Sequence, residues 1–220
     1  MIKLVNICKT YHSGKSNEII ALNSLNLEIK KGEMIAIMGT SGSGKSTLIN
    51  ILSCTIGFDS GTYYFNDKNI GELSDKELAF LRNKQIGVVH QDFQLLTENT
   101  VYENIEIPLL FSKIRKKERK ALCEKALSLV NIMDLKDKTV NTLSGGQKQR
   151  VSIARAIVNS PSLILADEPT GSLDSKKSNE IMSLLQEINS NNTTIVVVTH
   201  DKQIAQKCHR IVNILDGKID

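Results

Sequence analysis

The sequence predicts an α/β fold with three parts: a core around a parallel sheet, an N-terminal antiparallel sheet and an inserted helical segment. Late in the chain, two short apolar strands flank an amphipathic helix, which is typical of a βαβ unit with parallel strands. In the first thirty residues, apolar and polar side chains alternate as they do in half-buried strands. From about residue 93 to 158 the apolar periodicity is mainly helical.

The individual elements follow from these patterns and from local start and stop signals. The expected strands, in chain order, are residues 3–11, 25–29, 34–38, 63–65, 86–89, 163–166 and 194–198. Capping boxes at Ser74–Glu77 and Thr100–Glu103 indicate two helix starts, the first helix running through Leu81. Further helices are expected over 46–52, 147–158 and around 181–188. Apolar residues at helical spacing predict one buried face at Leu122, Ala126, Leu129 and Val130.

Composition places the 220-residue chain among ordinary globular proteins. Apolar residues make up 40% and charged residues 24%, and the net charge is +4. The four cysteines form no CxxC pair, so we expect reduced, mostly buried thiols and neither zinc nor disulfides. The N-terminus does not have the pattern of a signal peptide, and no apolar run approaches the roughly 20 residues of a spanning helix. We therefore expect a soluble protein whose membrane contacts, if it has them, are made through a partner.

A glycine-rich segment that matches G-x4-G-K-[ST] lies between a predicted strand and a predicted helix. Its glycines allow consecutive N–H groups to point at phosphate oxygens, and the helix adds its positive end. Lys45 is expected to reach the β- and γ-phosphates, and the Ser46 hydroxyl to ligate Mg²⁺. The motif leaves kinases, GTPases, helicases and transporters open. The predicted nucleotide-binding residues here are Gly39, Thr40, Ser41, Gly42, Ser43, Gly44, Lys45, Ser46 and Thr47.

Two acids, Asp167 and Glu168, end the predicted strand 163–166. Ligands of open α/β sheets bind at the carboxyl ends of the strands, so Asp167 is expected to hold Mg²⁺. Glu168 is expected to polarise the water that attacks the γ-phosphate. Two acids at a strand end could also be an ordinary surface turn. The phosphate-binding motif upstream favours the functional interpretation.

A second predicted anion-binding site lies at the start of the helix from Gln147, where Ser144 is followed by Gly145 and Gly146. One nucleotide does not need two such sites. A head-to-tail dimer would use both, because the phosphate loop of one copy would face the Ser-Gly-Gly turn of the other. With Leu143 and Lys148-Gln149-Arg150, this segment resembles the signature motif of the ABC ATPase family, and the resemblance covers essentially the whole chain.

The resemblance implies a P-loop (RecA-like) ATPase core and assigns further roles. Tyr11 would stack on adenine, and Gln91 would ligate Mg²⁺ and sense a transmembrane partner. Ser172-Leu173-Asp174 would cross a dimer interface, and His200 would contact the γ-phosphate. The expected ligands are ATP and Mg²⁺. The residues expected in each role are, for catalysis, Glu168, His200 and Gln91; for nucleotide in the opposite copy, Ser144, Gly145, Gly146 and Gln147; for Mg²⁺, Ser46, Gln91 and Asp167.

The domain organisation implied is a single unit over 1–220. Residues 1–92 and 159–220 would form the nucleotide-binding core with its antiparallel subdomain, and 93–158 the helical subdomain with the signature motif. Spacing leaves no room for a long coiled coil. The segment 166–174 resembles that of lipoprotein-release, macrolide-export and antimicrobial-peptide-export ATPases, and a cell-division ATPase is a close alternative.

The expected partners are an integral membrane permease and a second copy of the chain, which places the protein in the cytoplasm at the inner face of the membrane. No nucleic-acid partner is expected. The basic stretch 113–120 favours a solvated helix face, with proximity to anionic lipid headgroups as the sharper alternative. A nucleic-acid role is weaker, because no aromatic side chains interleave these charges. A soluble ABC ATPase that acts on nucleic acid or ribosomes is the alternative function.

Overall fold

In a computed structural model, which describes residues 1–112 and 114–219, the strands lie in two sheets. The first is antiparallel, in the order β2 (Ile19–Ile29), β1 (Ile2–Tyr11), β4 (Ser60–Phe65) and β5 (Lys68–Asn69). The second has the order β10 (Lys218–Ile219), β9 (Arg210–Leu215), β3 (Met34–Met38), β8 (Thr194–Val198), β7 (Leu163–Asp167) and β6 (Ile86–Val89). Its strands pair in parallel except for the β9–β10 hairpin. The predicted α/β class with an antiparallel sheet is confirmed.

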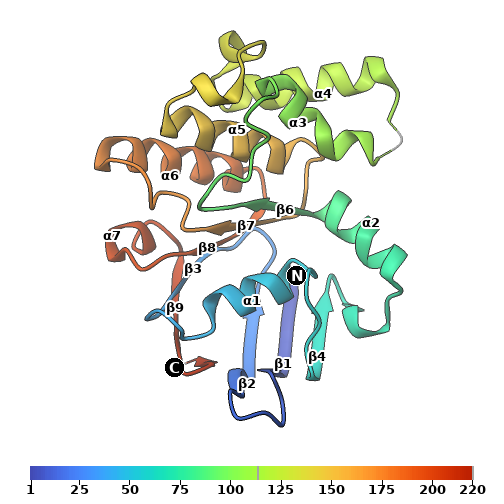
Figure 1. Ribbon diagram of the computed structural model, residues 1–220, viewed down its shortest axis with the longest axis vertical. Coiled ribbons are helices and arrows are strands. Elements are labelled where there is room, and N and C mark those ends of the chain that lie inside the picture. The colour runs from blue at the N-terminus through green and yellow to red at the C-terminus, as the bar shows by residue number, and fades with distance from the viewer. Residues whose placement is uncertain (113, 220) are drawn as a thin grey trace.

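The helices cover the second sheet from both sides (Figure 1). Helix α1 (Lys45–Leu52) lies between the two sheets, and α5 (Gly145–Ile157) and α6 (Ser175–Ser190) lie on the opposite face. Helices α3 (Val101–Leu110) and α4 (Lys116–Leu129) pack beyond α5. The remaining helical elements are α2 (Asp75–Gln85), α7 (Lys202–Ala205), η1 (Ile70–Glu72), η2 (Met133–Leu135) and η3 (Val140–Thr142).

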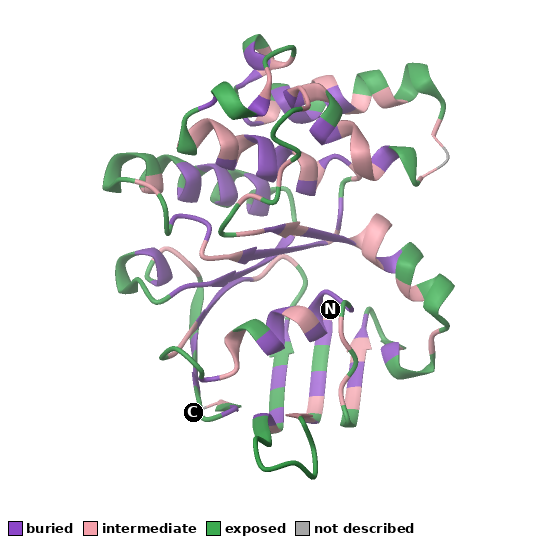
Figure 2. Cartoon of the chain, in the orientation of Figure 1, coloured by how far each residue is buried: buried purple, intermediate pink, exposed green. Residues whose placement is uncertain are grey.

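Two apolar cores hold these layers together, one on each face of the second sheet. Alternate residues of a strand point to opposite faces, so Ile164 of β7 belongs to the core beneath α5 and α6, whereas Leu163 and Leu165 belong to the core beneath α1. The burial pattern in Figure 2 follows this division, since α6 is buried toward the sheet and exposed on its outer side, whereas α5 is covered by the sheet on one side and by α3 and α4 on the other. The strand β7 is fully buried through Ala166, which fixes the position of the acid that ends it.

Both predicted capping boxes are present. Ser74 Oγ accepts from the Glu77 N–H and a Glu77 carboxylate oxygen accepts from the Ser74 N–H at 2.8 Å. The Thr100–Glu103 box has the same arrangement, with bonds of 3.2 and 2.7 Å. Each box satisfies N–H groups that a helix start leaves unpaired. The helix from Ser74 extends beyond the predicted end at Leu81, because the chain passes from Gln85 directly into β6.

The apolar face of α4 is confirmed in part, because Ala126 and the adjoining Val130 are buried as predicted. Cys123, Ala126 and Leu127 are its buried residues, whereas Leu122 and Leu129 are only half-buried. The helix is rotated because it packs on α3 and α5 through Cys123 and Leu127, which leaves the predicted stripe at the edge of a cavity. Lys113 of the basic stretch lies outside the described residues. The boundaries proposed at residues 92/93 and 158/159 stay predictions.

Candidate functional site

The glycine-rich loop joins β3 to α1 at the carboxyl end of a central strand. Gly44, the N-cap of α1, has φ 106°, which only glycine adopts without strain. A Cβ there would overlap the carbonyl oxygen of Ala21 on β2, and a Cβ on Gly39 would overlap the carbonyl oxygen of Ile214 on β9. The glycines are therefore required by close backbone packing as well as by the shape of the loop.

Hydrogen-bonding groups gather inside this loop. Lys45 Nζ donates to the carbonyl oxygens of Gly39 at 2.9 Å and Thr40 at 2.7 Å, so its ammonium group is held over the loop. Ser43 Oγ is buried with no hydrogen-bond partner among the described residues, and a buried polar atom without a partner is costly. Ser46 is exposed, and Thr47 is buried on the first turn of α1. A cationic loop with unused polar groups at a helix N-terminus fits a phosphate chain.

Asp167 ends β7, and its carboxyl group lies within the field of Lys45. Burial, reinforced by the charge of Glu168, raises the pKa of Asp167 above its ordinary value, and the Lys45 charge opposes this shift. A half-buried carboxylate whose ionisation is disfavoured is suited to a cation. Among the described residues, no group of three or more His, Cys, Asp or Glu side chains is placed to hold a metal ion. One carboxylate with a serine hydroxyl and phosphate oxygens fits Mg²⁺, which is commonly bound in this way.

The raised pKa of Asp167 predicts that Asp167→Asn stabilises the protein in the absence of nucleotide. A folded-state pKa above the unfolded value means that ionisation costs stability, so the cost is present at high pH and disappears as pH falls below the unfolded pKa. The variant should unfold at a higher temperature than wild type at pH 8 without Mg²⁺ and ATP, and the difference should shrink toward pH 4. Thermal melts by circular dichroism at both pH values measure this. A variant destabilised at pH 8 would contradict it.

Glu168 lies in the left-handed backbone region, with φ 44°, directly after β7. Its carboxylate accepts from Thr199 Oγ1 at 3.2 Å and from the His200 N–H at 3.1 Å, and it lies 2.6 Å from His200 Nδ1. The carboxylate is 13% exposed and the imidazole 75% exposed. A non-glycine residue at positive φ that is held by three contacts with two neighbouring residues is typical of a functional position. The structure therefore brings Glu168 and His200 together, as two of the predicted catalytic residues.

The other predicted residues of this site lie around the same strand ends. Gln91 follows β6. Its side-chain nitrogen lies 3.5 Å from the position that a Cβ on Gly171 would occupy, and the Glu168 side chain borders the same position. Tyr11 ends β1, and its ring centroid lies 5.8 Å from Lys9 Nζ. Tyr11 pairs with Ile19 on β2, the strand whose Ala21 carbonyl approaches Gly44. Tyr11 is thus connected to the phosphate loop through β2, and its side chain is half-buried.

The Ser144–Gly146 turn begins α5 as predicted from the glycines. Ser144 is its N-cap, and a capping box joins Ser144 to Gln147 by bonds of 2.9 and 3.4 Å. Leu173 packs beside Gly145, and Lys177 lies beside Gly146. The small cavity of about 170 Å³ at this turn is lined by residues of α5 and α6 and by none from the glycine-rich loop. Within one chain the two predicted anion sites are therefore separate.

Two residues of the site were not identified from the sequence. Thr199 donates to Glu168 and accepts from the Asp201 N–H, and its only signal was its place next to His200. Arg155 donates to the carbonyl oxygens of Gln94 at 2.5 Å and Phe93 at 2.9 Å. Arg155 thereby fixes the loop that contains Gln91. Because Arg155 lies 61 residues after Gln94 in the chain, no local sequence pattern predicts this contact.

Comparisons with known proteins agree with this geometry. The family model described as ABC transporter matches residues 22–171. An uncharacterised ABC transporter ATP-binding protein of Bacillus subtilis (strain 168), YknY, is 50% identical over 100% of this chain and 95% of its own length. The macrolide export ATP-binding/permease protein MacB of Pasteurella multocida (strain Pm70) is 45% identical over the whole chain, which spans 34% of that relative.

A solved structure is similarly close. The dimeric, post-hydrolysis structure of the ATP-binding cassette MJ0796, bound to ADP and Pi, matches with a TM-score of 0.91 and 42% identity, covering 100% of this chain and 97% of that chain. Within the described part of the chain, we find no helix with the length and apolar character needed to cross a bilayer. With a family model matched over more than half of its length and a relative at 50% identity, the chain belongs to the ABC transporter family and is an ABC-type ATPase.

Proposed function

We propose that this chain is the ATP-binding and ATP-hydrolysing subunit of an ABC transporter and that it powers a separate membrane permease. The observation that carries the proposal is the separation of two anion-binding helix starts, at Gly44–Lys45 and at Ser144–Gly146, on one chain. Each supports half of a nucleotide site, so two copies in head-to-tail contact would complete two sites. The related cassette MJ0796 is dimeric in a post-hydrolysis structure with ADP and Pi, which supports an assembly of two copies.

In this proposal the loop residues Gly39 to Thr47 bind the ATP phosphates, and Tyr11 stacks on the adenine. Lys45 already faces into the loop, where carbonyl oxygens hold its ammonium group. A nucleotide phosphate would replace those carbonyl contacts with charge-assisted ones, which are stronger. Mg²⁺, held by Ser46, Gln91 and Asp167, would neutralise phosphate charge as hydrolysis proceeds.

Glu168 and His200 are the residues proposed to act on the reacting groups. Glu168 orients and polarises the attacking water, because its carboxylate lies at the strand end beside the Mg²⁺ ligand Asp167. His200, 2.6 Å from Glu168, is exposed enough to reach a γ-phosphate, and Thr199 restrains the carboxylate. Closure of the second copy over the site would exclude water and bring Ser144, Gly145, Gly146 and Gln147 to the phosphates.

The permease is proposed to dock in a groove of about 510 Å³ between α2, α3 and the end of α5. Its rim carries Phe111, which is 77% exposed, and two further exposed apolar side chains, Phe80 and Leu110, lie nearby on the same helices. Arg155 and Gln94 line the groove, and Arg155 fixes the loop after Gln91. A short amphipathic helix of the permease suits such a groove and would sense the nucleotide through that loop.

Phe111→Asp is expected to abolish co-purification of the proposed membrane permease from the native cells, while the basal rate of ATP hydrolysis stays within about twofold, because a surface substitution leaves the fold intact. Leu215→Asp, which also replaces an exposed leucine but lies on β9 away from the groove, is the matched control and should retain the permease. Equal recovery with both variants would contradict this docking surface.

We propose export of macrolide-, peptide- or lipoprotein-type cargo, or mechanotransmission, as the work that this ATPase performs at the cytoplasmic face of the membrane. The similarity to the macrolide export protein MacB supports the first of these. The co-purification experiment described above also distinguishes a transporter subunit from a soluble ABC ATPase. Recovery of the permease supports the transporter subunit. Stimulation of ATP hydrolysis by DNA or ribosomes, with no integral membrane protein recovered, would support the soluble enzyme.

A further inference from the structure

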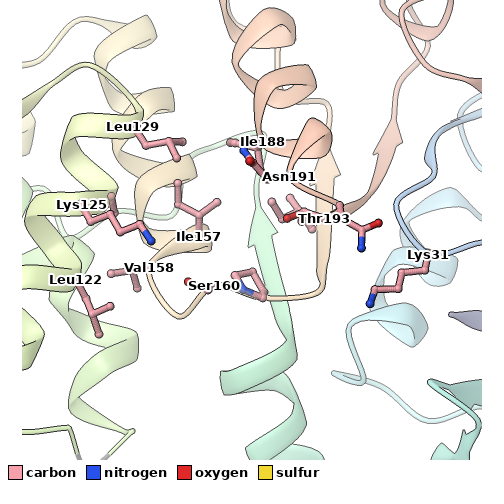
Figure 3. Close-up of a pocket in the computed structure, with 14 residues that line it drawn as sticks. Lys31, Leu122, Lys125, Leu129, Ile157, Val158, Ser160, Ile188, Asn191 and Thr193 are labelled. Carbon is pink, nitrogen blue, oxygen red and sulfur yellow. The ribbon is translucent and has the colours of Figure 1, made fainter.

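A cavity of about 560 Å³ lies at the amino-terminal ends of β7 and β8, at the opposite ends of these strands from Asp167 and His200. Figure 3 shows it between α4, the turn after α5 and the turn after α6. Ile164 contributes to its wall and lies three residues before Asp167 on β7, which is roughly 10 Å along a strand. The cavity is therefore separate from the ATP site but shares a rigid element with it.

Its lining is mostly apolar with a cationic rim. Eight of the fourteen lining residues are apolar, four are uncharged and polar, two are lysines and none is acidic. Lys31 and Lys125 lie on opposite sides with their amino groups directed toward the space between them (Figure 3). Neither lysine takes part in an ion pair within the described residues. Ile157, Ile188 and Leu129, which extends from α4 toward the end of α6, form the apolar wall.

We propose that this cavity binds a small amphipathic organic anion, specifically a free medium-chain carboxylate of about eight carbons. Its volume lies within the ~300–1,000 Å³ range of small-molecule pockets. The apolar wall would take the hydrocarbon chain, and the positive charges of the two rim lysines would attract the carboxylate. A nucleotide or inorganic phosphate fits less well, because the lining has too few polar groups to replace the hydration of a polyanion.

The cavity also contacts the far ends of three elements whose near ends carry the proposed ATP site. β7 leads to Asp167 and Glu168, α5 begins at the Ser144 turn, and α6 begins after Asp174. Ile164, Ile157 and Ile188 of these elements all line the cavity. If dimer closure shifts the helical segment α4–α5 against the sheet, a ligand that contacts both would favour one of the two positions. By linkage, ATP must then change the affinity for the ligand by the same factor.

Isothermal titration calorimetry of the full chain with octanoate, hexanoate and octan-1-ol tests the binding site. Each buried CH₂ contributes about fourfold in affinity, so octanoate should bind about fifteenfold more tightly than hexanoate. Lys125→Gln and Lys31→Gln should each weaken octanoate binding about fivefold and leave octan-1-ol binding unchanged. Lys117→Gln, an exposed lysine of α4 outside the cavity, is the matched control and should change neither.

Leu129→Trp should weaken binding of octanoate and octan-1-ol together, because the larger indole takes up part of the apolar space at this wall, with the fold checked by circular dichroism. Equal affinities for octanoate and hexanoate, or an octanoate affinity that neither lysine substitution changes, would overturn the proposal. Binding of phosphatidylglycerol vesicles through Lys31 and Lys125, with no binding of octanoate, would assign the lysines to a lipid surface and would also overturn it.

The coupling to ATP has its own readout, and it rests on the proposed nucleotide site. The dissociation constant of octanoate should differ at least fivefold with and without saturating Mg²⁺ and ATP in a Glu168→Gln protein, and by the same factor octanoate should change ATP affinity. Equal octanoate affinity in both conditions, in protein that demonstrably binds ATP, would overturn the coupling alone. Failure of that protein to bind ATP would instead count against the proposed nucleotide site.

Discussion

Glu168→Gln is expected to lower the rate of ATP hydrolysis by about 10²–10⁴-fold, the usual contribution of a positioned general base. The amide cannot accept the proton of the attacking water, yet it has nearly the same shape as the carboxylate that accepts from Thr199 and His200. ATP binding should therefore persist, and the ATP-bound form should accumulate. Phosphate release assays and nucleotide binding by equilibrium dialysis measure the two effects separately.

The control for this substitution is Glu187→Gln, an exposed acid near the end of α6, which should hydrolyse ATP at the wild-type rate. A Glu168→Gln protein with wild-type turnover would remove Glu168 from the mechanism. Loss of both turnover and ATP binding would also contradict the account, because the phosphate contacts come from the glycine-rich loop and Lys45 and do not involve Glu168.

Ser144→Arg is expected to abolish hydrolysis, to below about 1% of the wild-type rate, while each chain still binds ATP. The Arg side chain would occupy the surface that the opposite copy must approach, but within one chain this turn is separate from the glycine-rich loop. Steady-state ATPase assays and ATP binding by the same dialysis measure this.

Loss of a helix cap is an alternative explanation that a matched variant removes. Ser74→Arg deletes the equivalent N-cap of α2, with the same capping-box geometry, and should cost about 0.5–2 kcal/mol of stability without blocking hydrolysis. If Ser144→Arg retained turnover, or if Ser74→Arg lost it equally, the proposed role of the Ser144 turn would be wrong.

Local signals in the sequence were sufficient for much of the site. The glycine-rich loop, the capping boxes and the acids that end β7 each depend on residues within a few positions of one another, and these elements form where they were expected. The contact between Glu168 and His200 could be anticipated, because both follow strands that pair in parallel at the centre of the sheet.

Other features depend on long-range packing and have no local signature. The rotation of α4 results from its contacts with α3 and α5. Strand β9 was not expected, because alternation in Arg210–Leu215 is short, and only its pairing with β3 stabilises it. Arg155 reaches the loop after Gln91 from another helix, and the cavity at Lys31 and Lys125 joins residues about 90 positions apart. Spacing within a segment cannot predict such encounters.

The claim that two copies share each ATP site is tested most directly by the mass of the protein in solution. Light scattering of the Glu168→Gln protein should give the mass of one chain without nucleotide and of two chains with Mg²⁺ and ATP. The same protein with Ser144→Arg added should bind ATP and keep the mass of one chain. A double variant that still dimerises with ATP, or a Glu168→Gln protein that binds ATP and stays a single chain, would contradict the account.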